Sequence, residues 1–181
     1  MKFTTLLSAL SLSQILSAHL LNVEDPASFN HSSIAVNGRN YHFVDEGPRN
    51  AQLIVMCHGF PELWYMYKHQ IKHLSELGYR VVALDMIGYG QSDAPKELSA
   101  YTYESVTKDI KDLVPKLGAR SAVFLGHDWG SPIVWMMAVS HSQVVDGVIS
   151  ISVPFYSPLP TNDLEIIATF IPALSYQVIQ F

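Results

Sequence analysis

The strongest constraint on the fold of this chain is an alternation of short apolar runs with segments of helical periodicity. The runs Leu53–Met56 and Arg80–Asp85 are typical of strands that are buried on both faces of a sheet. Between them, apolar residues recur at helical spacing from Trp64 to Leu77, and Gly78 follows where a helix would end. This alternation predicts the α/β class, with a mostly parallel sheet that is covered by helices on both faces.

Further segments extend the same pattern along the chain. We expect additional strands at Ser33–Val36, Asn40–Val44, Ser121–Leu125 and Gly147–Ser152, and helices at Val106–Leu117 and Trp129–Ser140. The dipeptide Asn37-Gly38 suits a tight hairpin turn between the first two of these strands. Pro115 is expected to bend the last turn of its helix. Ligands bind at the carboxyl ends of the strands in such sheets, so reactive residues should directly follow strands.

Size and charge narrow the class of protein. The chain has 181 residues, of which 49% are hydrophobic, and this is enough to bury one core in a single domain. Its formal net charge is -5 and Lys and Arg are not clustered, which excludes nucleic acid as a partner. No His, Asp or Glu cluster has metal-ligand spacing and no glycine-rich nucleotide loop is present, so we expect no metal and no cofactor. The single cysteine, Cys57, lies in an apolar run and is predicted to be a buried, unreactive thiol.

The first 18 residues have the plan of a secretory signal peptide. One positive charge at Lys2 is followed by an uncharged, largely apolar stretch that ends at Ser17-Ala18. The stretch is shorter than the roughly 20 apolar residues that span a bilayer, so no membrane span is expected. Asn30 begins a glycosylation sequon, which agrees with export. We expect residues 1–18 to be a signal peptide of a secreted protein; the alternative is an N-terminal helix retained on an intracellular one.

The segment Gly126-His127-Asp128-Trp129-Gly130 lies directly between a predicted strand and a predicted helix. A sharp turn at this position lifts its middle residue above the sheet edge, and flanking glycines let the backbone pass. The residue presented here is Asp128, and a carboxylate is already ionised at neutral pH. It can attack an electrophilic saturated carbon and form an alkyl ester, whose hydrolysis needs hydrogen-bond donors for the oxyanion. The backbone N–H of Trp129 is well placed to be one of them.

A second motif, Cys57–Trp64, follows the Leu53–Met56 strand. A loop at this point supplies the other oxyanion donor in hydrolases of this architecture, and Phe60 N–H is the candidate. For His58 we expect a hydrogen bond that fixes the loop rather than a catalytic role. A third motif, Gly88–Asp93, follows the next strand, and we expect a tight turn there.

These motifs together resemble the epoxide hydrolase branch of the α/β-hydrolase fold family. The matching residues, in order, are His58-Gly59-Phe60-Pro61-Glu62, Trp64-Tyr65, His69-Gln70, Gly88-Tyr89-Gly90-x-Ser92 and Gly126-His127-Asp128-Trp129-Gly130. The resemblance implies that Asp128 opens an epoxide and that water then hydrolyses the ester. It also implies that Phe60 and Trp129 donate to the oxyanion, and that Tyr176 is a lid acid for the leaving oxygen. The aromatic residues Phe60, Trp64, Trp129, Phe155 and Tyr156 favour a small apolar epoxide as the substrate. The sequence leaves the oligomeric state open.

The family pattern also contains parts that have no match in this chain. The resemblance implies a second lid tyrosine, a catalytic histidine and an acid that orients it, and none of the eight histidines fits that role. We therefore expect residues 33–160 to be the N-terminal part of the hydrolase core and 161–181 to begin a lid. On this interpretation the chain is a truncated epoxide hydrolase, in which turnover is compromised.

Three rival interpretations remain open. A haloalkane dehalogenase shares the aspartate and the neighbouring Trp129, whose indole would help to hold a halide. A fluoroacetate-type dehalogenase resembles this chain less, because it has Arg where Trp129 stands. A catalytically inactive, truncated hydrolase module is the rival from another class. A serine hydrolase is excluded, since Ser131 does not occupy the apex of the turn.

Overall fold

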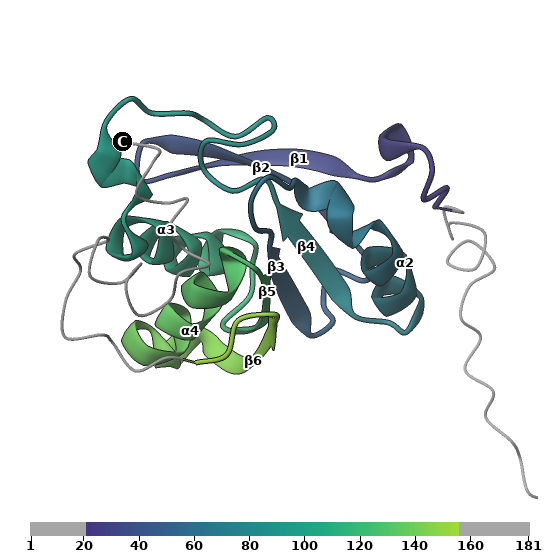
Figure 1. Ribbon diagram of the computed structural model, residues 1–181. Helices are drawn as coiled ribbons and strands as arrows, with labels where there is room; N and C mark the ends of the chain where they lie inside the picture. The colour runs from purple at the N-terminus through teal and green to yellow at the C-terminus, as the bar shows by residue number, and fades with distance from the viewer. Residues whose placement is uncertain (1–20, 156–181) are drawn as a thin grey trace, which may run out of the picture.

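A computed structural model describes residues 21–155 as one six-stranded sheet with helices on both sides (Figure 1). The sheet order is β1-β2-β4-β3-β5-β6. The strands are β1 His31–Val36, β2 Arg39–Glu46, β3 Leu53–Cys57, β4 Arg80–Leu84, β5 Ala122–His127 and β6 Val145–Ile151. The predicted signal peptide at 1–18, the predicted lid at 161–181 and Tyr176 lie outside the described residues.

The four strands from β4 to β6 in the sheet are parallel, whereas β1 and β2 form an antiparallel hairpin at one end. The turn of this hairpin is formed by Asn37 and Gly38, which have φ values of 50° and 81°. Two positive φ values in a two-residue turn match the twist of the flanking strands, and Asn-Gly is the sequence that tolerates them. The predicted hairpin and the predicted α/β class are therefore confirmed.

Helices cover both faces of the sheet (Figure 1). Helix α2 (Lys68–Glu76) packs on one face, and α3 (Tyr103–Lys116) and α4 (Gly130–Ser140) pack on the other. Short 3-10 segments are η1 Pro26–Ser28, η2 Trp64–Tyr67, η3 Leu98–Tyr101 and η4 Ser142–Val144. Within residues 21–155, no helix has the length and apolar character needed to cross a membrane.

The helix expected to begin at Trp64 is not α-helical throughout. Its first turn, Trp64–Tyr67, is a 3-10 segment, and the α-helix begins only at Lys68. The Tyr67 hydroxyl donates to the backbone oxygen of Cys57 at 2.9 Å, and the Trp64 N–H donates to Asp85 at 3.3 Å. These contacts hold the first turn against the sheet, and tertiary bonds of this kind cannot be deduced from hydrophobic spacing.

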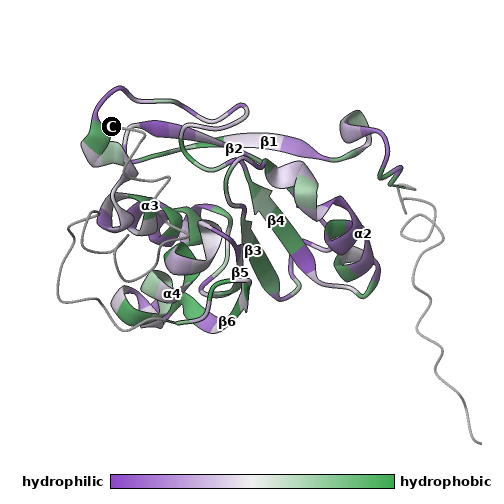
Figure 2. Cartoon of the chain, viewed as in Figure 1, coloured by the Kyte–Doolittle hydropathy of each residue, from purple (hydrophilic) through white to green (hydrophobic). Residues whose placement is uncertain are grey.

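Alternating residues of the central strands pack into two separate hydrophobic cores, one on each face of the sheet. Val55 packs with α3 and α4, through residues such as Ile110 and Met137. Its neighbour Ile54 faces the other way and packs with Ile71 of α2. Figure 2 shows the resulting concentration of hydrophobic residues along β3 and β4. Burial on both faces explains why these strands are continuously apolar, as expected for a parallel sheet under two helical layers.

Candidate active site

The segment between β5 and α4 is a sharp turn that presents Asp128. Its φ is 49°, in the left-handed region, which costs a non-glycine residue roughly 1–3 kcal/mol. The Ser131 N–H donates to the backbone oxygen of Asp128 at 2.9 Å and closes the turn. A Cβ at Gly126 would lie 2.3 Å from Gly130 O, and a Cβ at Gly130 would lie 2.0 Å from Cys57 O. The turn therefore requires glycine at both flanking positions.

Ser131, the serine nearest to the apex of the turn, has a structural position. Its side chain is fully buried, and its hydroxyl lies 3.0 Å from Gly126 O and 2.9 Å from Ile151 O. A fully buried hydroxyl that is engaged by backbone carbonyls has no access to a substrate. Asp128, and not Ser131, occupies the apex, as the sequence predicts.

The loop after β3 meets the Asp128 carboxylate. The Phe60 N–H donates to Asp128 Oδ1 at 2.9 Å. Gly59 permits this approach, because a Cβ there would lie 2.6 Å from the same oxygen. The structure thus brings together Asp128, Phe60 and Trp129. Among the hydrogen bonds of residues 21–155, however, none runs from the Trp129 N–H to this carboxylate. Phe60 and Trp129 are 46% and 36% exposed, so both residues next to the carboxylate carry accessible aromatic side chains.

A glutamate joins this loop to the turn that carries Asp128. Glu62 Oε2 accepts a hydrogen bond from the Gly59 N–H at 3.0 Å and lies 3.0 Å from His127 Nδ1. The residues next to Phe60 and Asp128 are therefore held by one carboxylate. In the sequence, Glu62 and His127 are only members of motifs, and the one signal for their linking role is their position close to Phe60 and Asp128.

His58 fixes the loop, as predicted. Its Nδ1 donates to the backbone oxygen of Gly59 at 2.8 Å, and its Nε2 accepts from the Met86 N–H at 3.0 Å. Burial lowers the pKa of His58, so the neutral ring that this bonding pattern requires is favoured. Both ring nitrogens are engaged, which leaves none for proton transfer to a substrate.

The Gly88–Asp93 loop is a tight turn that also borders the site. Gly88 N–H donates to Asp93 O at 2.8 Å, which closes the loop. The Tyr89 ring packs edge-on against the His58 ring, with centroids 5.1 Å apart. Burial raises the pKa of Tyr89, and the nearby Asp128 charge adds to this shift. The loop therefore places an aromatic side chain near Asp128, which the interpretation of this motif as a plain turn missed.

Cys57 ends β3 beneath this site and is fully buried. Burial raises the pKa of its thiol to about 12. The thiolate is the reactive form, and its population is negligible at pH 8 in the folded state. We expect iodoacetamide to leave Cys57 unmodified in the native chain and to label it rapidly after unfolding in guanidinium chloride. Rapid labelling of the native chain, followed by mass spectrometry, would contradict the buried position.

Asn30, the candidate glycosylation acceptor, precedes β1 and is exposed. Its side-chain amide donates to Glu46 Oε2 at 2.8 Å, and its backbone N–H donates to Glu46 Oε1. Since an amide nitrogen keeps one hydrogen when it carries a glycan, this contact is compatible with modification. Glycosylation of Asn30 stays a prediction.

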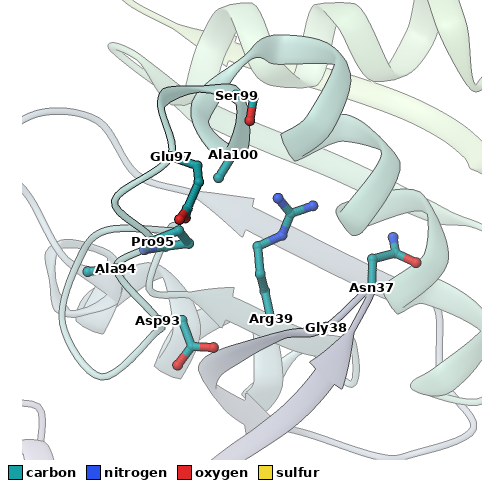
Figure 3. A pocket seen from close by; sticks show the side chains of 9 residues that line it. All are labelled: Asn37, Gly38, Arg39, Asp93, Ala94, Pro95, Glu97, Ser99 and Ala100. Atoms are coloured by element: carbon teal, nitrogen blue, oxygen red, sulfur yellow. The ribbon is translucent and has the colours of Figure 1, made fainter.

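A surface hollow of about 550 Å³ lies away from these residues, between the β1–β2 turn and residues 93–100 (Figure 3). Arg39 extends across it, and its Nη2 donates to Asp109 at 2.8 Å. The predicted active-site residues that the structure describes, Asp128, Phe60 and Trp129, do not line this hollow. Within residues 21–155, no group of three or more His, Cys, Asp or Glu side chains is arranged to hold a metal ion.

Comparison with known proteins gives consistent matches. Residues 52–177 match the family model of the alpha/beta hydrolase fold. Bifunctional epoxide hydrolase 2 of Sus scrofa is 40% identical over 156 residues, which cover 85% of this chain and 28% of that protein. Epoxide hydrolase B of Mycobacterium tuberculosis is 41% identical over 127 residues, which cover 69% of this chain and 36% of that protein. The chain thus spans about a third of the length of these relatives.

Solved structures resemble the chain to a similar degree. Epoxide hydrolase A of Mycobacterium thermoresistibile superposes with a TM-score of 0.75 at 38% identity, over 79% of this chain and 45% of that one. An epoxide hydrolase of Vigna radiata gives a TM-score of 0.74 at 34% identity, over 78% of this chain and 46% of that one.

Proposed function

The chain belongs to the α/β-hydrolase fold family, and from this membership we propose that its Asp128 is the nucleophile of an epoxide hydrolase. The observation that carries the proposal is the hydrogen bond from Phe60 N–H to Asp128 Oδ1 at 2.9 Å. It joins the carboxylate at the apex of the turn to a backbone donor from a second loop. The relatives named as epoxide hydrolases support the choice of substrate class.

The first step of the proposed reaction is nucleophilic attack by the carboxylate. An oxygen of Asp128 bonds to one carbon of the epoxide ring, and the bond between that carbon and the ring oxygen breaks. The ring oxygen leaves as an alkoxide and takes a proton from an acid, for which Tyr176 is our candidate. The product is a hydroxyalkyl ester on Asp128, and it retains every atom of the epoxide.

The second step is hydrolysis of this ester. Water attacks the ester carbonyl carbon, the carbonyl oxygen becomes an oxyanion, and collapse releases a diol and restores the carboxylate. Phe60 N–H already faces a carboxylate oxygen, and Trp129 N–H lies where backbone donors at the start of α4 lack helical partners. The ring nitrogens of His58 and the Nδ1 of His127 are engaged, so we propose that the base for this step is not one of them.

We propose an apolar substrate because the residues next to the carboxylate carry exposed aromatic side chains. Phe60 and Trp129 are 46% and 36% exposed, and Tyr89 packs nearby against His58. Apolar walls around one polar reacting group favour a substrate with an aromatic or aliphatic substituent on the epoxide. Small charged epoxides would gain no binding free energy from contact with these aromatic side chains.

The test is to treat the chain with styrene oxide or with 1-chlorohexane, quench in acid and measure the intact mass and the products. Ester formation with the epoxide adds the mass of the whole epoxide, whereas the chloroalkane adds its alkyl group and releases chloride. We expect the epoxide adduct on the peptide that contains Asp128, or its diol in solution. Labelling by the chloroalkane alone would establish a dehalogenase instead. No reaction with either reagent would leave an inactive module as the correct interpretation.

A further inference from the structure

Most histidines among residues 21–155 have a ring nitrogen engaged in a hydrogen bond. His31 and His42 contact each other at 2.9 Å, His58 holds the oxyanion loop, and His127 bonds to Glu62. Three remain for which the described residues offer no side-chain hydrogen bond: His69, His73 and His141. Two of these three lie on the same helix, α2, and both are exposed.

His69 and His73 are four residues apart within α2, which spans Lys68–Glu76. Four residues advance about 400° around the helix and roughly 6 Å along it, so the two side chains share one face, one turn apart. Neighbours at this spacing can touch. Two imidazoles at this spacing on one helix face are the arrangement with which helical metal sites bind zinc.

Helix α2 holds the two imidazoles on a fixed support. Ile71, midway between them in sequence, is fully buried against the sheet and directs His69 and His73 to solvent. Figure 2 shows hydrophilic residues along much of α2. The lysines that directly precede the two histidines in sequence are both paired, Lys68 with Glu24 at 3.0 Å and Lys72 with Glu76. A metal ion would therefore meet two ligands on one packed helix, with the adjacent lysines already paired to carboxylates.

We propose that His69 and His73 form a two-histidine site for a borderline transition metal ion, such as Ni²⁺, Zn²⁺ or Cu²⁺. Imidazole nitrogen suits these ions, whereas Mg²⁺ and Ca²⁺ require oxygen ligands. Water completes the coordination, because two side chains are too few to do so. The site lies on the opposite face of the sheet from α3 and α4 and is independent of the proposed epoxide chemistry.

The test is the Tm of the untagged chain with NiCl2 or MgCl2 at neutral pH. A ligand that binds the folded helix stabilises it, and we expect Ni²⁺ to raise Tm by about 5–10 °C when the free metal is about 100-fold above its Kd. Mg²⁺ should give no shift. His69→Gln and His73→Gln should each weaken Ni²⁺ binding at least about tenfold in isothermal titration, since either change removes the chelate.

His141→Gln is the matched control, because it removes a histidine outside the pair and should leave Ni²⁺ binding unchanged. All three histidines make no side-chain hydrogen bond among the described residues, so each variant should fold like the wild type without metal. Wild-type chain that shows no Ni²⁺ shift would overturn the proposal. So would a shift that survives both His69→Gln and His73→Gln, or an equal shift with Mg²⁺.

Discussion

An Asp128→Asn variant is expected to be labelled by styrene oxide at least about a thousandfold more slowly than the wild-type chain. The amide has the same shape as the carboxylate but is a far weaker nucleophile, and Asn tolerates the φ of 49° that the turn imposes. The loss should therefore come from chemistry and not from unfolding. The measurement is the rate of adduct formation by intact mass, together with Tm for both chains.

An Asp128→Gly variant separates the backbone strain at this position from the reactivity of the carboxylate. Glycine adopts a positive φ without strain, so this variant should unfold with a free energy about 1 kcal/mol higher than wild type. This variant loses the hydrogen bond from Phe60 N–H to the carboxylate. The contact is exposed to solvent, so a water molecule can accept from the Phe60 N–H instead. Greater stability with no labelling would indicate that the strained conformation serves reactivity.

Two outcomes would contradict the assignment of the nucleophile. If Asp128→Asn were labelled at the wild-type rate, the reacting group would lie elsewhere, and peptide mapping would identify it. If Asp128→Gly were strongly destabilised, the carboxylate would serve to hold the turn together. The proposal of Asp128 as nucleophile would then lose its basis.

The fold was predictable because its main determinants are local in sequence. Continuous apolar strands, helical spacing and the Asn37-Gly38 turn each depend on neighbouring residues, and the structure confirms all three. Pro115 lies in the last turn of α3, as expected. The exception, the first turn before α2, depends on hydrogen bonds between residues far apart in the chain, such as Tyr67 and Cys57. No periodicity encodes such contacts.

The site was predictable only where a motif sits at the end of a strand. Topology alone brings the loops after β3 and β5 together, since these strands are adjacent and parallel. That adjacency places Phe60 beside Asp128. The link through Glu62 and the position of Tyr89 depend on side-chain directions within loops, and strand order does not determine these.

The hydrogen bonds around Asp109 show how strongly the hairpin depends on one buried charge. This fully buried carboxylate of α3 accepts from Asn37 at 2.9 Å, from Arg39 at 2.8 Å and from the Tyr41 hydroxyl at 2.8 Å. The hydrogen bond to Asp109 raises the pKa of Arg39, and burial followed by the same carboxylate raises the pKa of Tyr41. All three donors come from the β1–β2 hairpin, so Asp109 is its main polar link to α3.

Asp109→Ala is therefore expected to lower the free energy of unfolding by about 3–5 kcal/mol, because it leaves the Arg39 guanidinium and the Tyr41 hydroxyl without their buried acceptor. Asp112→Ala is the matched control. Asp112 also accepts from Asn37, at 3.0 Å, but its side chain is 31% exposed, and we expect a loss below about 1 kcal/mol. Urea unfolding of both variants measures the difference. Equal losses in the two variants would contradict this prediction, because removing a buried acceptor should cost more than removing a partly exposed one. The hairpin would then be held mainly by its apolar contacts.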